Sequence, residues 1–208
     1  MPKKGDRINY MRKIYVLEFL TLDGVIQAPG GPGEDTSNNF QYGGWMGPHF
    51  EDEVGGQEMN KQMEETKALL LGRKTYDIWV NFWPTHTDMW PQVNDITKYV
   101  VSSTLENPSW ENTKVIKSVE ELKELKNSEG PDLQVYGSAN LVQTLMEHDL
   151  VDEFWLKTFP VTIGDGKRLF EKGTRPFAFH LYESTVTPSG VIFAKYKRAG
   201  EVKTAQIN

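Results

Sequence analysis

The stretch from Leu133 to Phe170 predicts a strand, a tight turn, a helix and a second strand in succession. A short apolar run at residues 133–136 ends at Gly137-Ser138, and residues 152–159 form a second strand-like run. Between them, four apolar residues share the spacing of one helical face: Leu141, Val142, Leu145 and Met146. This succession is the crossover unit of an α/β sheet, so we expect strands that run parallel.

The turn at Gly137-Ser138 has the residues of an anion-binding turn. Glycine lets the backbone approach a ligand closely, and Ser138 can cap the following helix by accepting a hydrogen bond from a backbone N–H. The N-terminus of that helix, at Ala139 and Asn140, would then face a ligand as a site for negative charge. A lone glycine-serine turn is more often just a turn, so this motif gains weight only beside others.

Composition narrows the classes of function. The 208 residues, 38% of them hydrophobic, can bury one sizeable core, and no shift in composition marks a linker, so one domain is expected. A net charge of −6 argues against nucleic acid or a membrane surface as a partner and favours a small molecule. The absence of cysteine excludes disulfides, cysteine-ligated zinc and a thiol nucleophile.

Residues 1–10 are polar and precede the first apolar run, so we expect a loose extension followed by a domain at residues 11–208. They lack the apolar core of a signal peptide, and no run in the chain reaches the length of a membrane span. The expected compartment is the cytoplasm.

Residues 13–22 predict a central strand, because their apolar character is continuous. The strand ends at Asp23-Gly24, and a long loop rich in glycine and proline follows. Long loops in compact domains are often ligand walls or lids. Five large apolar residues of this loop either form a wall against a flat ligand or close over the core: Phe40, Tyr42, Trp45, Met46 and Phe50.

Residues 51–67 predict a helix that begins with three acidic residues, Glu51, Asp52 and Glu53. Acidic residues suit the positive end of the helix dipole, which is a sufficient structural reason for any one of them. The alternative is that one carboxylate faces a cavity beneath the loop and orients or protonates a substrate. Asp52 is the candidate for that role.

Two more strand ends carry residues suited to phosphate. Residues 68–71 predict a buried strand, and Gly72-Arg73-Lys74-Thr75 follows, with Thr75 placed to cap the next helix and two cations beside it. Residues 98–102 predict another strand, which leads into the hydroxyls of Ser102 and Ser103. Ligands lie outside the carboxyl ends of the strands in an open α/β sheet, so three such ends predict one elongated ligand with several phosphates. A dinucleotide fits this description.

Two local motifs complete the pattern. Ser118, with Glu121 three residues later, predicts a capped helix. Residues 177–186 and 191–197, joined by a Thr-Pro-Ser-Gly turn, predict a closing β-hairpin.

The ordered set of motifs resembles the dihydrofolate reductase superfamily. The set comprises Leu22-Asp23-Gly24, Leu70-Leu71-Gly72-Arg73-Lys74-Thr75-Tyr76, Val100-Val101-Ser102-Ser103, Val135-Tyr136-Gly137-Ser138-Ala139, and Val151-Asp152-Glu153 followed by Pro160 and Gly164-Asp165-Gly166. The likeness covers residues 11–198 and is greatest to the reductase domain of the bifunctional deaminase-reductase of riboflavin biosynthesis. The resemblance implies a three-layer α/β/α fold with a mostly parallel central sheet and a C-terminal antiparallel hairpin, and NADPH as the hydride donor.

The resemblance also implies roles for individual residues. Gly72, Arg73, Lys74 and Thr75 would hold phosphate oxygens, Ser102 and Ser103 would lie near the adenosine 2′-phosphate, and Gly137, Ser138, Ala139 and Asn140 would cover the pyrophosphate. Asp23 would lie in a loop over the nicotinamide, and Trp45, Phe50, Asp52 and Thr158 would line the substrate side. Asp23 and Asp52 are the candidate catalytic carboxylates.

The implied activity is NADPH-dependent reduction of a C=N or C=O group in a small heteroaromatic or sugar-linked substrate, as in 5-amino-6-(5-phosphoribosylamino)uracil reductase of riboflavin biosynthesis. Two alternatives stay open: a nucleotide-binding protein without turnover, and a true dihydrofolate reductase. His49-Phe50-Glu51 has the H-x-E pattern of a zinc deaminase, but the chain has no cysteine pair to hold the metal. No metal site is predicted.

The last strands predict assembly. Residues 154–156 and 177–182 place large apolar side chains at alternating positions on both faces, more than one helix-covered face needs. The alternative is that these side chains are ordinary core. The riboflavin reductases that the chain resembles pair through this part of the sheet, so we expect an isologous homodimer built from the last strands and residues 164–170.

Overall fold

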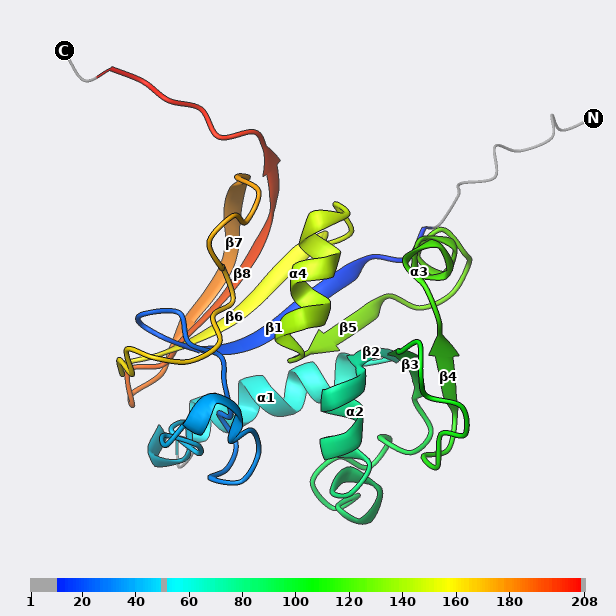
Figure 1. Ribbon diagram of the computed structural model, residues 1–208. Helices are drawn as coiled ribbons and strands as arrows, with labels where there is room; N and C mark the ends of the chain where they lie inside the picture. The colour runs from blue at the N-terminus through cyan, green and yellow to red at the C-terminus, as the bar shows by residue number, and fades with distance from the viewer. Residues whose placement is uncertain (1–10, 50–51, 207–208) are drawn as a thin grey trace, which may run out of the picture.

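Eight strands form one sheet in the order β4-β3-β2-β5-β1-β6-β8-β7 in a computed structural model, which describes residues 11–49 and 52–206 (Figure 1). The strands are β1 (Ile14–Thr21), β2 (Ala68–Gly72), β3 (Thr97–Val101), β4 (Thr113–Ile116), β5 (Leu133–Tyr136), β6 (Glu153–Phe159), β7 (Ala178–Val186) and β8 (Ile192–Gly200). The α-helices are α1 (Glu53–Glu65), α2 (Arg73–Trp79), α3 (Val119–Lys126) and α4 (Ala139–Glu147).

Strand β1 lies at the centre of the sheet, as its apolar sequence predicts. It pairs in parallel with β5 up to Leu17 and with β6 up to Thr21. The predicted crossover unit is confirmed, and it passes over β1, because β5 and β6 flank that strand on its two sides. Since β1 remains paired with β6 after its pairing with β5 has ended, β1 and β5 separate at their carboxyl ends.

The C-terminal part of the sheet is antiparallel. Strand β8 pairs with β6 and with β7, and β7 forms the edge of the sheet. The other strands, from β4 to β6 in the sheet order, run parallel to one another. The predicted fold class, an α/β sheet with a C-terminal antiparallel hairpin, is confirmed.

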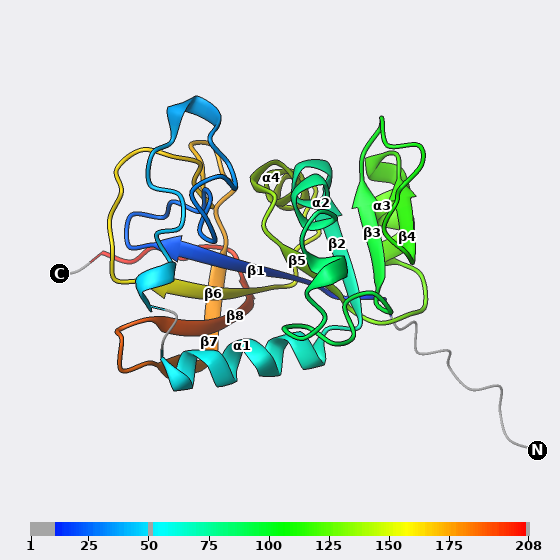
Figure 2. The same ribbon diagram turned by 90° about the horizontal axis from the view of Figure 1, so that it is seen from below.

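Helices cover both faces of the sheet, with α4 and α1 on opposite sides (Figure 1, Figure 2). The four apolar residues predicted for the inner face of α4 are all buried in the core between α4 and the sheet. On the α1 side, Trp90 and Tyr136 belong to a second core, against which Met63 of α1 packs. Alternate residues of β2 enter the two cores, which is why its sequence is apolar without a break.

The predicted helix ends are partly wrong. Helix α1 runs from residue 53 to residue 65, two residues shorter at each end than predicted, and Asp52 is its N-cap. Thr75 does not cap α2, because Gly72 occupies the N-cap position and Thr75 lies inside the helix. Ser138 is the N-cap of α4, but its hydroxyl makes no capping hydrogen bond. The Ser118 cap of α3 is confirmed, since its Oγ accepts from Glu121 N at 3.2 Å.

Strand β4 was not predicted from the sequence, because its four residues, Thr113 to Ile116, include a lysine and follow a polar turn. The predicted N-terminal extension and the predicted roles of Phe50 and Glu51 fall outside the described residues. Among the helices in residues 11–49 and 52–206, none combines the length and apolar character that crossing a membrane requires.

Candidate functional site

Three of the predicted turns meet at one edge of the sheet. Strands β3, β2 and β5 are parallel neighbours, so their carboxyl ends lie side by side. The turn after β5 touches the start of α2: a Cβ built on Gly72 would lie 1.8 Å from Ser138 Oγ, and one built on Gly137 would lie 3.7 Å from Thr75 Oγ1. The structure therefore brings together the segments that the sequence marks as phosphate-binding.

The turn from β5 into α4 has an unusual backbone. Gly137 and Ser138 both have a left-handed conformation, with φ of 64° and 75°. A glycine adopts this conformation without strain, whereas a serine does so at a cost that local packing must offset. Ala139 and Asn140 form the first turn of α4, whose free N–H groups point out of this edge of the sheet.

The turn after β3 supplies hydroxyl groups. Ser102 Oγ accepts hydrogen bonds from Thr104 N at 3.3 Å and from Leu105 N at 3.1 Å, so this hydroxyl shapes the turn. Ser103 and Thr104 are exposed, and Arg73 Nη1 reaches Thr104 Oγ1 at 3.5 Å. The exposed hydroxyls are therefore the ones free to meet a ligand, and Arg73 lies within reach of them.

Both predicted cations of the site have acidic partners in the structure. Arg73 Nε donates to both carboxylate oxygens of Asp77, at 2.8 and 2.9 Å, four residues along α2. Lys74 Nζ donates to Asp35 Oδ1 at 2.6 Å, and Asp35 belongs to the long loop after β1. The Arg73–Asp77 pair is exposed and contributes about 0–1 kcal/mol, whereas Asp35, the partner of Lys74, is mostly buried.

Asp23 joins the loop after β1 to the glycine-rich turn after β6. Its carboxylate accepts hydrogen bonds from Thr21 Oγ1 at 2.5 Å and from Gly164 N at 2.8 Å. The Thr21 hydroxyl, together with the backbone N–H groups, lowers the pKa of Asp23 to about 2. A carboxyl group ionised in this way is a poor proton donor at neutral pH, so its contacts support a structural role; its predicted catalytic role stays a prediction.

Asp52 lies at the start of α1, with its carboxylate turned to backbone N–H groups. Oδ1 accepts from Val54 N at 3.0 Å and from Gly55 N at 3.3 Å, and Oδ2 accepts from Ser189 N at 2.8 Å. The bond from Ser189 N in particular lowers the pKa of Asp52. The contacts are those of a helix cap that also holds the β7–β8 turn, and the predicted catalytic role stays a prediction.

The aromatic residues of the loop separate into two groups. Trp45 donates from Nε1 to Gln27 O at 2.8 Å and packs edge-on against Phe159 of β6. Phe40 is buried in the same cluster, whereas Tyr42 is exposed. Trp45 and Phe40 thus close over the end of the sheet, and Thr158, which pairs with Leu20 of β1, lies next to this cluster in β6.

Two buried ionisable residues were not predicted from the sequence. Glu18 in β1 and Lys157 in β6 are 3% and 0% exposed, and Glu18 Oε1 and Lys157 Nζ have no hydrogen-bond partner among the described residues. Burial raises the pKa of Glu18 to about 8 and lowers the pKa of Lys157 to about 7. A lone charged residue inside each apolar strand, in YVLEFL and FWLKTF, was the signal that could have identified them.

Glu18 follows Leu17, the last residue of β1 that pairs with β5. Lys157 Nζ lies 4.9 Å from the ring centre of Phe19 and 5.9 Å from that of Tyr136, the last residue of β5. Glu18 therefore lies just past the end of β5, and Lys157 lies near the same end with its side chain on the opposite face of the sheet, because Lys157 pairs with Phe19 and Glu18 pairs with Leu156. Glu18 differs from Asp23 and Asp52 in that its surroundings raise its pKa, whereas theirs lower the pKa of each carboxyl group.

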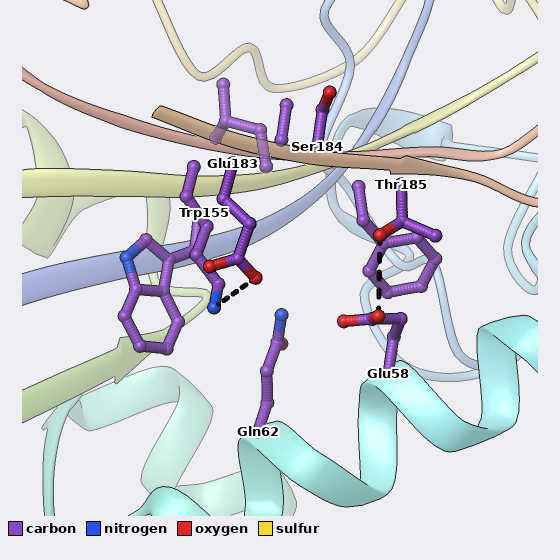
Figure 3. A pocket seen from close by; sticks show the side chains of 10 residues that line it. Glu58, Gln62, Trp155, Glu183, Ser184 and Thr185 are labelled. Carbon is purple, nitrogen blue, oxygen red and sulfur yellow. Dashed lines mark hydrogen bonds and ion pairs between the residues drawn. The ribbon is translucent and has the colours of Figure 1, made fainter. Parts of the chain in front are cut away.

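Two hollows lie away from this edge. One, between α1 and strands β6, β8 and β7, has a volume of about 10 Å³, and Gln62 and Glu58 of α1 face Glu183 and Thr185 across it (Figure 3). It has room for roughly one water molecule. The other is a groove of about 320 Å³ lined by apolar residues, Arg175 and Arg198.

Residues 12–193 of the chain match the family described as the RibD C-terminal domain. The chain belongs to this family. The resemblance inferred from the motifs is thereby confirmed, and the match spans every predicted site residue from Asp23 to Thr158.

The chain is also similar to individual proteins. The chain is 29% identical over 195 residues to the uncharacterized protein YyaP of Bacillus subtilis (strain 168), covering 89% of this chain and 94% of YyaP. Its fold is similar to that of a Shewanella sp. PV-4 protein whose name refers to riboflavin biosynthesis, with a TM-score of 0.61 and 23% identity over 90% of this chain and 99% of that one. It is also similar to the fold of Enterococcus faecalis dihydrofolate reductase complexed with NADP(H) and RAB-propyl, with a TM-score of 0.59 and 14% identity over 91% and 98% of the two chains. At these identities the two structures show a shared fold.

Proposed function

We propose that the protein is an NADPH-dependent reductase that transfers hydride to a C=N or C=O group of a small heteroaromatic or sugar-linked substrate. Membership of the RibD C-terminal domain family supports a reductase-type function. One observation supports NADPH as the cofactor: three strand-end turns meet at one edge of the sheet, and Arg73 and Lys74 lie beside them.

The residues at this edge fit a dinucleotide phosphate. The left-handed Gly137 has no side chain between the turn and a ligand, and the N–H groups at the start of α4 suit a pyrophosphate. Lys74 and Arg73 supply cations, and Ser103 and Thr104 supply exposed hydroxyls for a 2′-phosphate. NADPH, when bound, supplies the hydride.

The chain itself contributes positioning and a proton. The loop from Leu22 to His49 closes over the carboxyl end of β1 and excludes water through Trp45 and Phe40. Glu18 is a carboxyl group near the β1–β5 separation whose pKa burial raises to about 8, so we propose it as the proton source, directly or through a water. Asp23 and Asp52 hold the surrounding segments in place.

Fluorescence titration with NADPH and NADH tests the cofactor. We expect a clear preference for NADPH, because the cations and hydroxyls at this edge can bind the 2′-phosphate, which NADH lacks. Loss of a charge-assisted hydrogen bond to phosphate costs about 1.5–3 kcal/mol, so Arg73→Ala is expected to weaken NADPH roughly ten- to a hundred-fold and NADH less. Equal affinity for the two cofactors, unchanged in Arg73→Ala, would contradict the assignment.

A second candidate, a nucleotide-binding protein without turnover, is favoured by one observation. The carboxylates of Asp23 and Asp52 are both engaged with backbone N–H groups. Oxidation of NADPH in the presence of pterins, pyrimidines and carbonyl compounds separates the two: the reductase oxidises NADPH with at least one substrate class, whereas the binding protein only binds it.

A further inference from the structure

Asp35, in the loop after β1, forms ion pairs with cations from two other parts of the chain. Its Oδ1 atom lies 2.6 Å from Lys74 Nζ, near the start of α2, and its Oδ2 atom lies 2.5 Å from Lys167 Nζ, beyond the glycine-rich turn after β6. The Asp35 side chain is only 12% exposed. One carboxylate therefore links three segments that are far apart in the sequence.

Several further contacts fix Asp35 in this position. Ser37 donates to Oδ1 from its N–H at 3.1 Å and from its hydroxyl at 2.6 Å. The buried Gln27 donates to Asp35 O at 3.1 Å, and its own Oε1 accepts from Lys167 N at 3.1 Å. Burial opposes the charge, but the bonds from Lys167, Lys74 and Ser37 hold the pKa of Asp35 well below its usual range.

Lys74 is the exposed member of this cluster, with a side chain that is 55% exposed. Among the described residues, Asp35 is the one acceptor that its ammonium group has. The Lys167 side chain is 25% exposed and lies deeper. Lys74 can therefore turn toward a ligand while Lys167 and Ser37 keep Asp35 in place.

We propose that Asp35 is an internal counterion, which a phosphorylated ligand must displace from Lys74. This inference rests on the proposed function, because it takes Lys74 to be a phosphate-binding residue. A phosphate oxygen that approaches Lys74 Nζ meets a fixed carboxylate of the same sign of charge, and like charges at short range repel. Asp35 consequently lowers the affinity for phosphorylated ligands and leaves the affinity for uncharged ligands unchanged.

Isothermal titration calorimetry of the full chain with adenosine 2′,5′-bisphosphate tests the proposal. Asp35→Asn removes the negative charge and keeps the shape and the acceptor for Ser37. We expect it to bind the bisphosphate about ten-fold more tightly than the wild type, since one charge-assisted contact is at stake. Adenosine, which has no phosphate, is expected to bind both proteins equally.

Glu183→Gln is the matched control. It also removes one carboxylate from an ion pair, with Lys195 at 2.8 Å, but on the edge strand β7 away from the site. Its affinity for the bisphosphate is expected to equal that of the wild type. In a Lys74→Gln background the gain from Asp35→Asn is expected to shrink, because Asp35 and the phosphate no longer compete for an ammonium group and only the repulsion between them remains.

Ser37→Ala is a second variant for the case in which Asp35→Asn melts at a much lower temperature than the wild type. It loosens the hold on Asp35 without removing the charge, and the expected gain is roughly two-fold. Equal or weaker binding of the bisphosphate by folded Asp35→Asn overturns the proposal and leaves Asp35 as a residue that positions Lys74.

Failure of the proposed function gives a different result. If the wild type and Asp35→Asn bind neither NADPH nor the bisphosphate, the reductase assignment fails, and inorganic pyrophosphate becomes the probe. Tighter pyrophosphate binding by Asp35→Asn than by the wild type then supports the counterion role. No binding of pyrophosphate by either protein overturns it.

Discussion

Replacing Lys157 with methionine is expected to stabilise the protein. Lys157 is fully buried, and its ammonium group has no acceptor among the described residues. Burial, the largest cause, lowers its pKa from 10.5 to about 7, with a further contribution from Lys195. Methionine has a similar length and no charge, so Lys157→Met removes the desolvated group and keeps the packing of the stem.

The size of the gain follows from the two pKa values. The pKa of Lys157 falls by about 3.5 on folding, and each pH unit corresponds to about 1.4 kcal/mol. The cost of burying the charged side chain is therefore at most about 5 kcal/mol. Two losses in the variant oppose this gain. The attraction between the ammonium group and the Phe19 ring, about 0.5–2 kcal/mol, disappears, and Glu18 loses a neighbouring cation that favours its charged form. We therefore expect Lys157→Met to raise the free energy of unfolding at pH 7 by about 1–3 kcal/mol.

The stability of the wild type is expected to depend on pH, because Lys157 loses its proton at a lower pH in the folded protein than in the unfolded chain. The folded-state pKa of Lys157 is depressed, so the folded protein binds fewer protons than the unfolded chain between pH 7 and 10.5, and the wild type becomes more stable as the pH rises through this window. The advantage of Lys157→Met over the wild type is therefore expected to fall by about 1.4 kcal/mol per pH unit above pH 7.5, so that it vanishes or reverses by pH 9.5.

Urea unfolding at several pH values measures this difference, with Lys98→Met as the control. Lys98 is equally buried, but its Nζ donates to Val93 O at 3.0 Å and to Asn94 O at 2.9 Å. Its replacement leaves two carbonyl groups without a donor and is expected to destabilise the protein by about 1–3 kcal/mol. A Lys157→Met variant that is less stable than the wild type at pH 7, with an unchanged m-value, would refute the reasoning.

Three further predictions follow from the site and the hairpin. Gly137→Val is expected to abolish NADPH binding while circular dichroism shows a folded protein, because a β-branched residue does not tolerate φ of 64° and would block the backbone's approach to the pyrophosphate. Gly72→Ala is expected to lower the free energy of unfolding by about 1–3 kcal/mol in urea melts, because the new Cβ would lie 2.8 Å from Ser138 Cβ. Gly47→Ala is the control: Gly47 has open space around it, so the free energy of unfolding is expected to change little. Light scattering behind size exclusion is expected to give twice the 23.8 kDa chain mass, because Leu181 and Tyr182 are exposed on the edge strand β7; a monomer mass at micromolar concentration would rule out the dimer.

The parallel part of the fold was predictable because its signals are local and repeated. The helical spacing of Leu141, Val142, Leu145 and Met146 identifies α4 and its buried face, and the unbroken apolar runs identify β1 and β2. The order of the strands follows from the crossover rule only in part, because no local signal places β1 between β5 and β6. That placement depends on contacts between residues more than a hundred positions apart.

Helix capping was less predictable, because the same residue types occur both at helix N-caps and in other tight turns. Ser138 has the chemistry of a helix cap, but the left-handed turn at residues 137–138 directs its side chain toward Gly72. Thr75 follows a glycine that already occupies the N-cap position, so the threonine falls within the first turn of α2. The capping rule applies to the residue whose backbone leaves the helix, and sequence alone does not say which of four neighbouring residues that is.

The candidate site was predictable in its turns and its cations, but not in the acidic partners of those cations. The residues at Gly72–Thr75 and Gly137–Asn140 were identified because glycine, cations and hydroxyls cluster within a few positions. The partner of Lys74 is Asp35, 39 positions earlier in a loop whose sequence predicts a ligand wall, a lid or a cover over the core. A phosphate and Asp35 would compete for the same ammonium group, that of Lys74. The affinity for a cofactor would therefore depend on the long-range pairing of Lys74 with Asp35. Only the folded chain shows which carboxylate makes this pair.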